Sequence, residues 1–219
     1  MLEEFKLVGK KLFEEGLITS HGGNMSVRQG DKIFITAHGS MLSELKDEDI
    51  IEVSLAEGDP NDGKASCELV VHRAIYKGSK AQAIVHAHPA EAIALSIQED
   101  RIIPQDAEGR FYTRVVPVVK PKEAIASAEA GRELGTVFNS SYRAAMIRGH
   151  GSFVIGENLL DAYKVTSALA ASAKIIVALK MITRPIPQSA PRKEDPYKKR
   201  SVIPTGIGIM GRRMPYHKR

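Results

Sequence analysis

The segment Ala-Ile-Val-His-Ala-His-Pro-Ala at residues 83–90 constrains the fold of this chain more than any other stretch. It opens with the apolar, β-branched character of a buried strand, and Pro89 then ends the strand and suits the first turn of a helix over residues 90–97. Because side chains two residues apart in a strand share a face, His86 and His88 are expected to project together. Two such imidazoles are typical ligands of a divalent transition metal, although a pair of structural histidines gives the same pattern.

The composition favours one globular domain in a reducing compartment. The chain has 219 residues, of which 43% are hydrophobic and 26% charged, which is enough for one sizeable core. Its single cysteine excludes an internal disulfide. The first residues are acidic and amphipathic, unlike a signal peptide, and no apolar run approaches the roughly 18 residues of a membrane span. We therefore expect a cytoplasmic protein with no membrane partner.

The net charge of +5 is distributed unevenly. From Arg184 onward, ten Lys and Arg face only two acidic residues, a local charge of +8, so residues 1–183 carry a net charge of −3. This basic segment also holds six of the eleven prolines and no motif that reads nucleic acid. The sequence therefore predicts a main domain over residues 1–183, a basic Pro-rich tail over residues 184–219, and no nucleic-acid partner.

Helical and strand patterns alternate along the main domain, which indicates an α/β fold. Residues 101–112 are irregular and carry several titratable groups, and no internal repeat is present. The expected helices cover residues 2–16, 65–76, 90–97, 122–136 and 158–180, and the expected strands cover residues 32–36, 50–54, 83–88, 115–119, 144–147 and 153–155.

Two glycine-containing turns have the composition of anion-binding loops. In the first, Gly23 permits a positive φ and a close backbone approach to a ligand, and Asn24 and Ser26 add short hydrogen-bonding side chains. The second turn contains His38 and Gly39. Taken alone, the first turn is better interpreted as a tight helix-to-strand connection than as an anion-binding loop.

The helix over residues 65–76 is expected to open with Ser66 as its N-cap and Glu68 in its first turn. A helix N-terminus favours a bound phosphate as readily as it favours the Glu68 carboxylate. We interpret His72, one turn later, as structural. Glycines on both sides of His150 leave its imidazole uncrowded, as a metal ligand on a turn requires.

Four motifs in this order resemble the class II aldolase/adducin family, over about residues 2–182: Gly23-Asn24-Met25-Ser26, Ser66-Cys67-Glu68, His86-x-His88-Pro89 and Gly149-His150-Gly151. The resemblance implies that Glu68 is the carboxylate that moves between metal and substrate. It implies a zinc site formed by His86, His88 and His150. It also implies a phosphate pocket formed by Gly23, Asn24, Gly39, Ser66 and Cys67. Apart from the resemblance, we expect His38 to reinforce this pocket when protonated.

The chain departs from the family pattern at three places. His38 stands where a Thr or Ser usually precedes the glycine, and Cys67 replaces the second serine before the glutamate. Where a relative supplies a tyrosine proton donor from a neighbouring subunit, this chain offers Glu108, Tyr112 or neither. Family members also have a mobile C-terminal segment near the active site, for which Tyr216 is the candidate donor.

The resemblance further implies a three-layer α/β architecture with a mostly antiparallel central sheet flanked by helices on both faces. It implies a homotetramer with active sites at subunit interfaces. The expected activity is a zinc-dependent aldolase that reversibly cleaves a ketose 1-phosphate to dihydroxyacetone phosphate and an aldehyde through an enediolate. The alternatives are a decarboxylase, dehydratase or epimerase acting on a related sugar phosphate, and a non-catalytic adducin-like interaction module.

Overall fold

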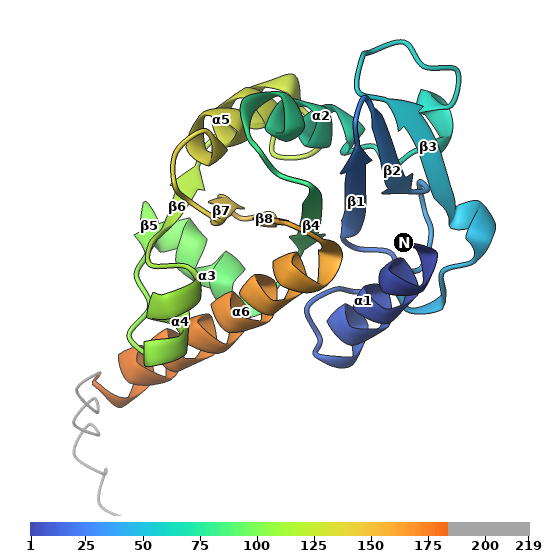
Figure 1. Cartoon of the computed structure of the whole chain (residues 1–219). Helices are drawn as coiled ribbons and strands as arrows, with labels where there is room; N and C mark the ends of the chain where they lie inside the picture. The colour runs from blue at the N-terminus through green and yellow to red at the C-terminus, as the bar shows by residue number, and fades with distance from the viewer. Residues whose placement is uncertain (184–219) are drawn as a thin grey trace, which may run out of the picture. The chain divides into compact units, whose positions relative to one another are not determined.

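One mixed β-sheet runs through the centre of the computed structural model, which describes residues 1–183 (Figure 1). The spatial order of its eight strands is β3-β2-β1-β4-β8-β7-β6-β5. Every neighbouring pair is antiparallel except β6 and β7, which run parallel. The strands are β1 (Asn24–Gln29), β2 (Lys32–Thr36), β3 (Ile50–Ser54), β4 (Ala83–Ala87), β5 (Arg101–Ile102), β6 (Val116–Val119), β7 (Ala144–Ile147) and β8 (Gly151–Gly156).

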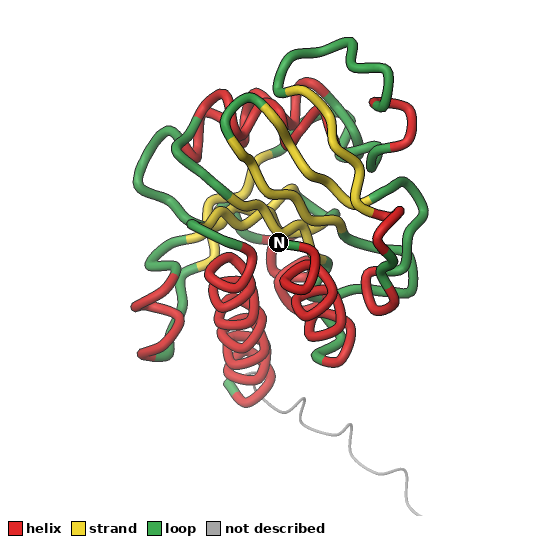
Figure 2. Tube along the Cα trace, turned by 45° about the vertical axis from the view of Figure 1, so that its right-hand side comes forward, coloured by secondary structure: helices red, strands yellow, loops and turns green. Residues whose placement is uncertain are grey.

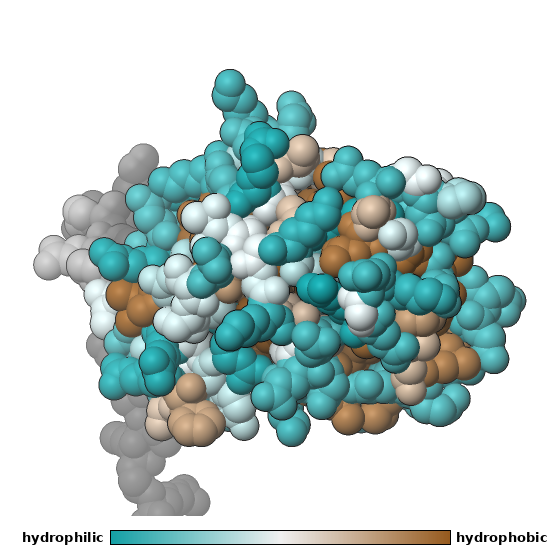
Figure 3. Space-filling model, turned by 45° about the horizontal axis from the view of Figure 1, so that its top comes forward, coloured by the Kyte–Doolittle hydropathy of each residue, from teal (hydrophilic) through white to brown (hydrophobic). Residues whose placement is uncertain are grey.

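Helices cover both faces of the sheet, which confirms the predicted three-layer α/β fold with a mostly antiparallel sheet. The helices are α1 (Leu2–Glu14), α2 (Leu69–Gly78), α3 (Ala90–Gln98), α4 (Ala107–Tyr112), α5 (Ala128–Phe138) and α6 (Leu159–Ile182). Helices α2 and α5 pack on one face, and α1, α3, α4 and α6 lie on the other (Figure 1). Figure 2 shows α1 and α6 side by side beneath the sheet, where the Leu160 N–H donates to the Glu4 carboxylate. Seen from the α2 and α5 side, the surface is mostly hydrophilic, with smaller apolar areas between the polar side chains (Figure 3).

Strand β4 is buried along its whole length because helices cover it on both faces and it pairs on both edges. On one edge Asn24 of β1 faces His86, and on the other edge Phe153 of β8 faces the same residue. Strands in this environment are nearly continuous apolar runs, which explains why the sequence of β4 is so conspicuous. Three short 3₁₀ helices, Leu42–Glu44, Asp47–Asp49 and Asp62–Lys64, join the elements before α2.

Two predicted helix starts are wrong. Helix α2 begins at Leu69 with Glu68 at its N-cap position, not Ser66, because the Ser66 N–H bonds to the Thr36 carbonyl and so holds this segment against β2. Helix α5 begins only after Ser127, whose hydroxyl accepts the Ala130 N–H. The stretch expected to be irregular between residues 101 and 112 forms β5 and α4, the latter capped by Asp106.

Helix α6 is the one helix within residues 1–183 that is long and apolar enough to cross a membrane by length and composition. Its buried side chains belong to the core cluster that it shares with α1 and β4. The same composition is therefore used here to build a core. The tail over residues 184–219, with its predicted boundary and Tyr216, lies outside the described residues.

Candidate active site and metal centre

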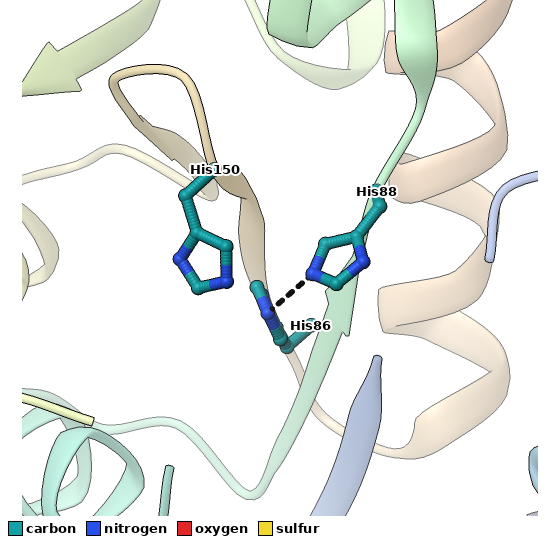
Figure 4. A group of neighbouring side chains, drawn as sticks. All are labelled: His86, His88 and His150. Atoms are coloured by element: carbon teal, nitrogen blue, oxygen red, sulfur yellow. Dashed lines mark hydrogen bonds between the residues drawn. The ribbon is translucent and has the colours of Figure 1, made fainter. Parts of the chain in front are cut away.

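Three histidine side chains from two segments converge at the carboxyl end of β4 (Figure 4). His86 lies in β4, His88 follows it, and His150 comes from the turn between β7 and β8. The Nε2 atoms of His86 and His88 are 2.9 Å apart, and one ring nitrogen of each of the three residues lies within 4.8 Å of the others. The structure therefore brings together the three histidines that the motifs singled out.

Neighbouring residues of β8 hold the His86 ring in one orientation. Its Nδ1–H donates to the Ser152 carbonyl at 2.9 Å, so its Nε2 carries the lone pair. The ring also stacks on Phe153, with 4.1 Å between ring centroids. At Gly151 a Cβ would lie 2.5 Å from His88 Cδ2 and 2.9 Å from His86 Cε1, so only glycine allows β8 to pass so close to both rings.

The electrostatic environment keeps all three imidazoles neutral, which is their ligating form. Burial, together with His88 and His150, holds the pKa of His86 well below its usual range. Burial and the neighbouring His150 lower the pKa of His88 to about 4. Burial also lowers the pKa of His150, against an opposing effect of the Ala124 backbone. Two converging lone pairs at 2.9 Å repel unless a proton or a cation lies between them, so the donor set fits a metal ion.

Glu68 is the acidic group nearest to this cluster in the described structure, with its Oε1 3.8 Å from Nε2 of His150. Its side chain is buried, and neither carboxylate oxygen has a hydrogen-bond partner within residues 1–183. Burial raises the pKa of Glu68 to about 7, and the nearby Ala126 N–H offsets part of this rise although it does not complete a hydrogen bond to the carboxylate. A buried carboxylate without a partner is costly, so this group is suited to a bound cation or to a proton taken from a substrate.

The predicted phosphate residues fall into two neighbouring groups. His38, Ser66 and Cys67 line one cavity of about 480 Å³, because a bridge between Ala37 and Ala65 joins the end of β2 to the approach to α2. Gly39, the next residue after His38, has a φ of +72°. Gly23 and Asn24 instead begin β1 beside His86 and do not line this cavity. At Gly23, φ is +80° and a Cβ would lie 2.8 Å from the His86 carbonyl oxygen.

The candidate proton donors lie away from the histidine cluster within this chain. Glu108 and Tyr112, both on α4, line a separate cavity of about 170 Å³ against α6, and none of the three histidines borders it. Within residues 1–183 of one chain, the structure therefore does not bring either residue into the histidine cluster. Tyr216 lies outside the described residues.

Sequence reasoning missed a buried polar network beneath Asn24. His72, interpreted above as merely structural, bonds to both Asn24 and Ser26, and Ser26 bonds to Tyr76. A signal was present: Asn24 and Ser26 are two apart on a strand, and His72 and Tyr76 are four apart on a helix, so each pair shares a face. Only the packing of α2 over β1 shows that the two faces meet.

Several known proteins are similar to this chain in sequence and fold. The family model described as Class II Aldolase and Adducin N-terminal domain matches residues 3–177. The chain is 31% identical over 178 residues to the L-fuculose phosphate aldolase of Methanocaldococcus jannaschii, which covers 79% of this chain and 93% of that protein. It is 34% identical over 184 residues to the 3-oxo-tetronate 4-phosphate decarboxylase of Pectobacterium atrosepticum, which covers 80% of this chain and 83% of that protein.

Among solved structures, the L-fuculose-1-phosphate aldolase of Thermus thermophilus superimposes with a TM-score of 0.79 at 40% identity. The match covers 82% of this chain and 94% of that one. Two reaction types therefore occur among relatives of comparable identity.

Proposed function

This chain belongs to the class II aldolase and adducin family, and from that premise we propose that it is a zinc-dependent aldolase of the cytoplasm. Its substrate is a ketose 1-phosphate similar to L-fuculose 1-phosphate, and its products are dihydroxyacetone phosphate and an aldehyde. The similarity to two proteins named as aldolases of this phosphate supports the substrate class.

The observation that carries the proposal is the position of an unpartnered buried carboxylate beside three neutral imidazoles. His86, His88 and His150 are the proposed ligands, and Glu68 is the proposed base. A three-histidine set leaves a coordination position open for substrate, as catalytic zinc sites require. A non-catalytic, adducin-like interaction module would have no use for such a group of buried polar side chains.

Zinc bound by the three histidines would supply Lewis acidity toward the carbonyl and hydroxyl oxygens of the substrate. In cleavage, a base takes the proton of the hydroxyl beyond the breaking carbon–carbon bond, and the electron pair of that bond remains with the phosphate-bearing half as an enediolate. Glu68 is the base of the reverse, bond-forming direction, in which it takes a proton from carbon. In cleavage its conjugate acid, which burial favours, returns that proton to carbon and releases dihydroxyacetone phosphate. The proposed acceptor of the hydroxyl proton is Glu108 or Tyr112 of a neighbouring subunit. Tyr216 is the candidate from the tail.

The substrate phosphate is assigned to the two groups of residues around the start of α2 and β1. Backbone N–H groups at glycine turns and at a helix N-terminus favour a dianion, and the His38 imidazole adds to them when protonated. The proposed residues are Gly23, Asn24, His38, Gly39, Ser66 and Cys67. We propose a homotetramer, as the family resemblance implies. Glu108 and Tyr112 line a cavity that none of the three histidines of their own chain borders, which fits a role for them in the site of a neighbouring subunit.

A second candidate reaction is decarboxylation of a phosphorylated 3-oxo acid. It is favoured by the 34% identity to a protein named as such a decarboxylase. The same metal and phosphate residues would serve either reaction. In both, the carbon–carbon bond next to the ketone breaks, and the ketone becomes an enediolate. Dehydration and epimerisation of a related sugar phosphate remain alternatives within the same chemistry.

One screen separates these reactions. Purified, zinc-loaded, full-length protein is offered a panel of ketose 1-phosphates with coupled detection of dihydroxyacetone phosphate, and in parallel 3-oxo acid phosphates with detection of carbon dioxide. The aldolase proposal expects the first signal. Carbon dioxide release alone would replace it with decarboxylation, and protein that binds no zinc would favour the interaction module.

The Glu68→Gln variant tests the assignment of the base. Glutamine keeps the size of the side chain and removes its basicity, so turnover should fall about 100-fold or more while zinc content stays unchanged. Turnover is measured by the coupled assay and zinc by elemental analysis. A fully active Glu68→Gln enzyme would move the proton transfer to Glu108 or to a tyrosine.

A further inference from the structure

A row of four buried, hydrogen-bonded side chains connects helix α2 to the start of β1. The phenol of Tyr76 and the hydroxyl of Ser26 are 2.7 Å apart, and the same hydroxyl lies 2.7 Å from Nδ1 of His72. On the other side of the ring, Nε2 of His72 lies 2.6 Å from Oδ1 of Asn24. His72 and Ser26 are fully buried, and Asn24, at 6% exposure, is the member of the row nearest to solvent.

The hydrogen bonds that link these four side chains can all run from donor to acceptor in the same sense, and only one sense satisfies every buried donor. Tyr76 donates to Ser26, Ser26 donates to Nδ1 of His72, and Nε2–H of His72 donates to Oδ1 of Asn24. In the reverse direction the buried Tyr76 O–H would have no acceptor within residues 1–183, which costs free energy. Tyr76 therefore sets the tautomer of His72, and His72 in turn sets which end of the Asn24 amide faces inward.

His72 is neutral near neutral pH, because burial lowers its pKa to about 3. A neutral ring has one donor and one acceptor, which is the condition for passing a direction from Ser26 to Asn24. Phe153 packs at its edge, with 5.9 Å between ring centroids, and hydrogen bonds at both ring nitrogens hold the ring in place.

The Asn24 side chain lies on the same face of the sheet as the proposed metal ligand His86. Asn24 pairs directly with His86 across β1 and β4, and directly paired residues project to the same face. Its Nδ2 has no hydrogen-bond partner in the part of the chain that the structure describes. On α2, the His72 N–H bonds to the carbonyl of Glu68, so one helical turn connects the proposed base to the residue that holds the amide.

We propose that His72 is a positioning residue that locks the Asn24 amide with its NH₂ group, rather than its oxygen, toward a bound phosphate. This inference rests on the proposed function, which assigns Asn24 to the phosphate pocket. Without the His72 donor, the amide turns freely between its two orientations, and one of them presents an oxygen to a dianion. Charge-assisted hydrogen bonds are about twice as strong as neutral ones, so loss of this donor should weaken phosphate binding about tenfold.

The test uses inorganic phosphate as the probe of zinc-loaded, full-length protein, with affinity measured by calorimetry and by competitive inhibition. We expect Asn24→Ala and His72→Leu each to weaken phosphate binding about tenfold, and the double variant to be no weaker than either single variant, because both changes remove one interaction. His72→Gln should restore most of the affinity, since its amide N–H replaces the Nε2–H donor. KM for a phosphorylated substrate should rise while kcat changes little.

Two controls separate positioning from a general loss of structure. Thr166→Val removes a buried hydroxyl on α6 that bonds to the Ala162 carbonyl, and phosphate affinity should be unchanged. Ser26→Ala is the second variant, for use if His72→Leu does not fold. It should weaken phosphate binding two- to threefold, because the His72 ring is then no longer held in one tautomer. Nitrogen-15 spectra of histidine-labelled protein should show the Nε2–H tautomer at His72.

The outcomes are distinguishable. If Asn24→Ala weakens phosphate binding and His72→Leu does not, or if His72 carries its proton on Nδ1, the positioning role is wrong while the phosphate pocket stands. Unaltered phosphate affinity in Asn24→Ala would overturn both the pocket and the inference. Equal loss of activity toward phosphorylated and unphosphorylated substrates in His72→Leu would also overturn the inference.

Discussion

Gly151 lies where β8 passes closest to the two histidine rings of β4. Substitution by alanine would put a Cβ 2.5 Å from His88 Cδ2 and 2.6 Å from the Ala87 carbonyl oxygen, so the rings must move. We expect Gly151→Ala to weaken zinc binding about tenfold or more, as loss of ligand orientation does elsewhere. Chelator competition with elemental analysis measures this. The matched control is Gly63→Ala, where a Cβ meets nothing within 4 Å; full zinc affinity in Gly151→Ala would show that the rings adjust freely.

His72 predicts a pH dependence of stability. Its pKa is about 3 in the folded protein against 6.5 for an unperturbed histidine, so below about pH 6.5 the unfolded chain binds a proton that the folded chain refuses. The contribution is therefore complete above pH 6.5 and is lost as the pH falls toward 3. In metal-free protein, His72→Gln should make the slope of unfolding free energy against pH shallower in this range, by up to about 1.4 kcal/mol per pH unit. Urea unfolding at a series of pH values measures the two slopes, and parallel slopes would contradict the burial argument.

At the scale of elements, α2 depends on a pair of charges that connects it to the turn before it. Arg73 of α2, which is 5% exposed, donates twice to the Asp62 carboxylate at 2.7 Å and also to the Ser54 carbonyl. These contacts fix α2 against the segment that carries Ser66 and Cys67. The position of the Glu68 carboxylate, at the first turn of this helix, therefore depends on a contact one turn away.

Asp62→Asn tests this contact. It leaves the Arg73 charge buried and unpaired, so the free energy of unfolding should fall by about 2 kcal/mol in urea titrations. The matched control is Glu52→Gln, which breaks the exposed pair with Lys32 and should cost less than about 0.5 kcal/mol. A similar small effect for both variants would mean that the Ser54 carbonyl alone holds Arg73.

At the scale of the whole molecule, our proposal is that the site draws its groups from two copies of the chain. Phe111 of α4 is 79% exposed, and Met181 and Ile182 at the end of α6 are also exposed, which suits an interface between subunits. Glu108 lies on α4 beside Phe111 and far along the chain from Glu68. A proton donor on α4 is therefore expected to serve the histidines of a neighbour.

Mixing two inactive variants tests this arrangement. Glu68→Gln lacks the base and Glu108→Gln lacks a candidate donor, and some sites in mixed oligomers contain both intact groups. We expect activity to reappear after the two proteins are unfolded together and refolded, and light scattering should give the mass of four chains. The same mixture made with Tyr112→Phe identifies the other candidate. Failure of both mixtures, with oligomers present, would place the donor in the same chain or in the tail.

The local order of this chain follows from its sequence by itself. Periodicity and motif spacing predict the buried run of β4, Pro89 at its end, and the two motifs that carry His86, His88 and His150. These features depend on residues that are neighbours along the chain. The three-layer α/β fold, with its mostly antiparallel sheet, was expected from the family resemblance and is confirmed. The start of α2 was not predictable, because Ser66 uses its N–H on the Thr36 carbonyl and so does not start the helix.

Only the tertiary structure decided which polar groups share the site. Asn24 and His72 are 48 residues apart, and their hydrogen bond exists because α2 packs over β1. The position of α2 also buries Glu68 and raises its pKa, whereas the packing of α4 on α6 places Glu108 in a cavity that the three histidines do not border. Burial and distance between remote segments depend on the whole set of packed elements, whereas a pattern within a few residues depends on the chain alone. For this reason the sequence determined the metal-binding motifs, and the fold decided the electrostatics and the hydrogen-bond network around them.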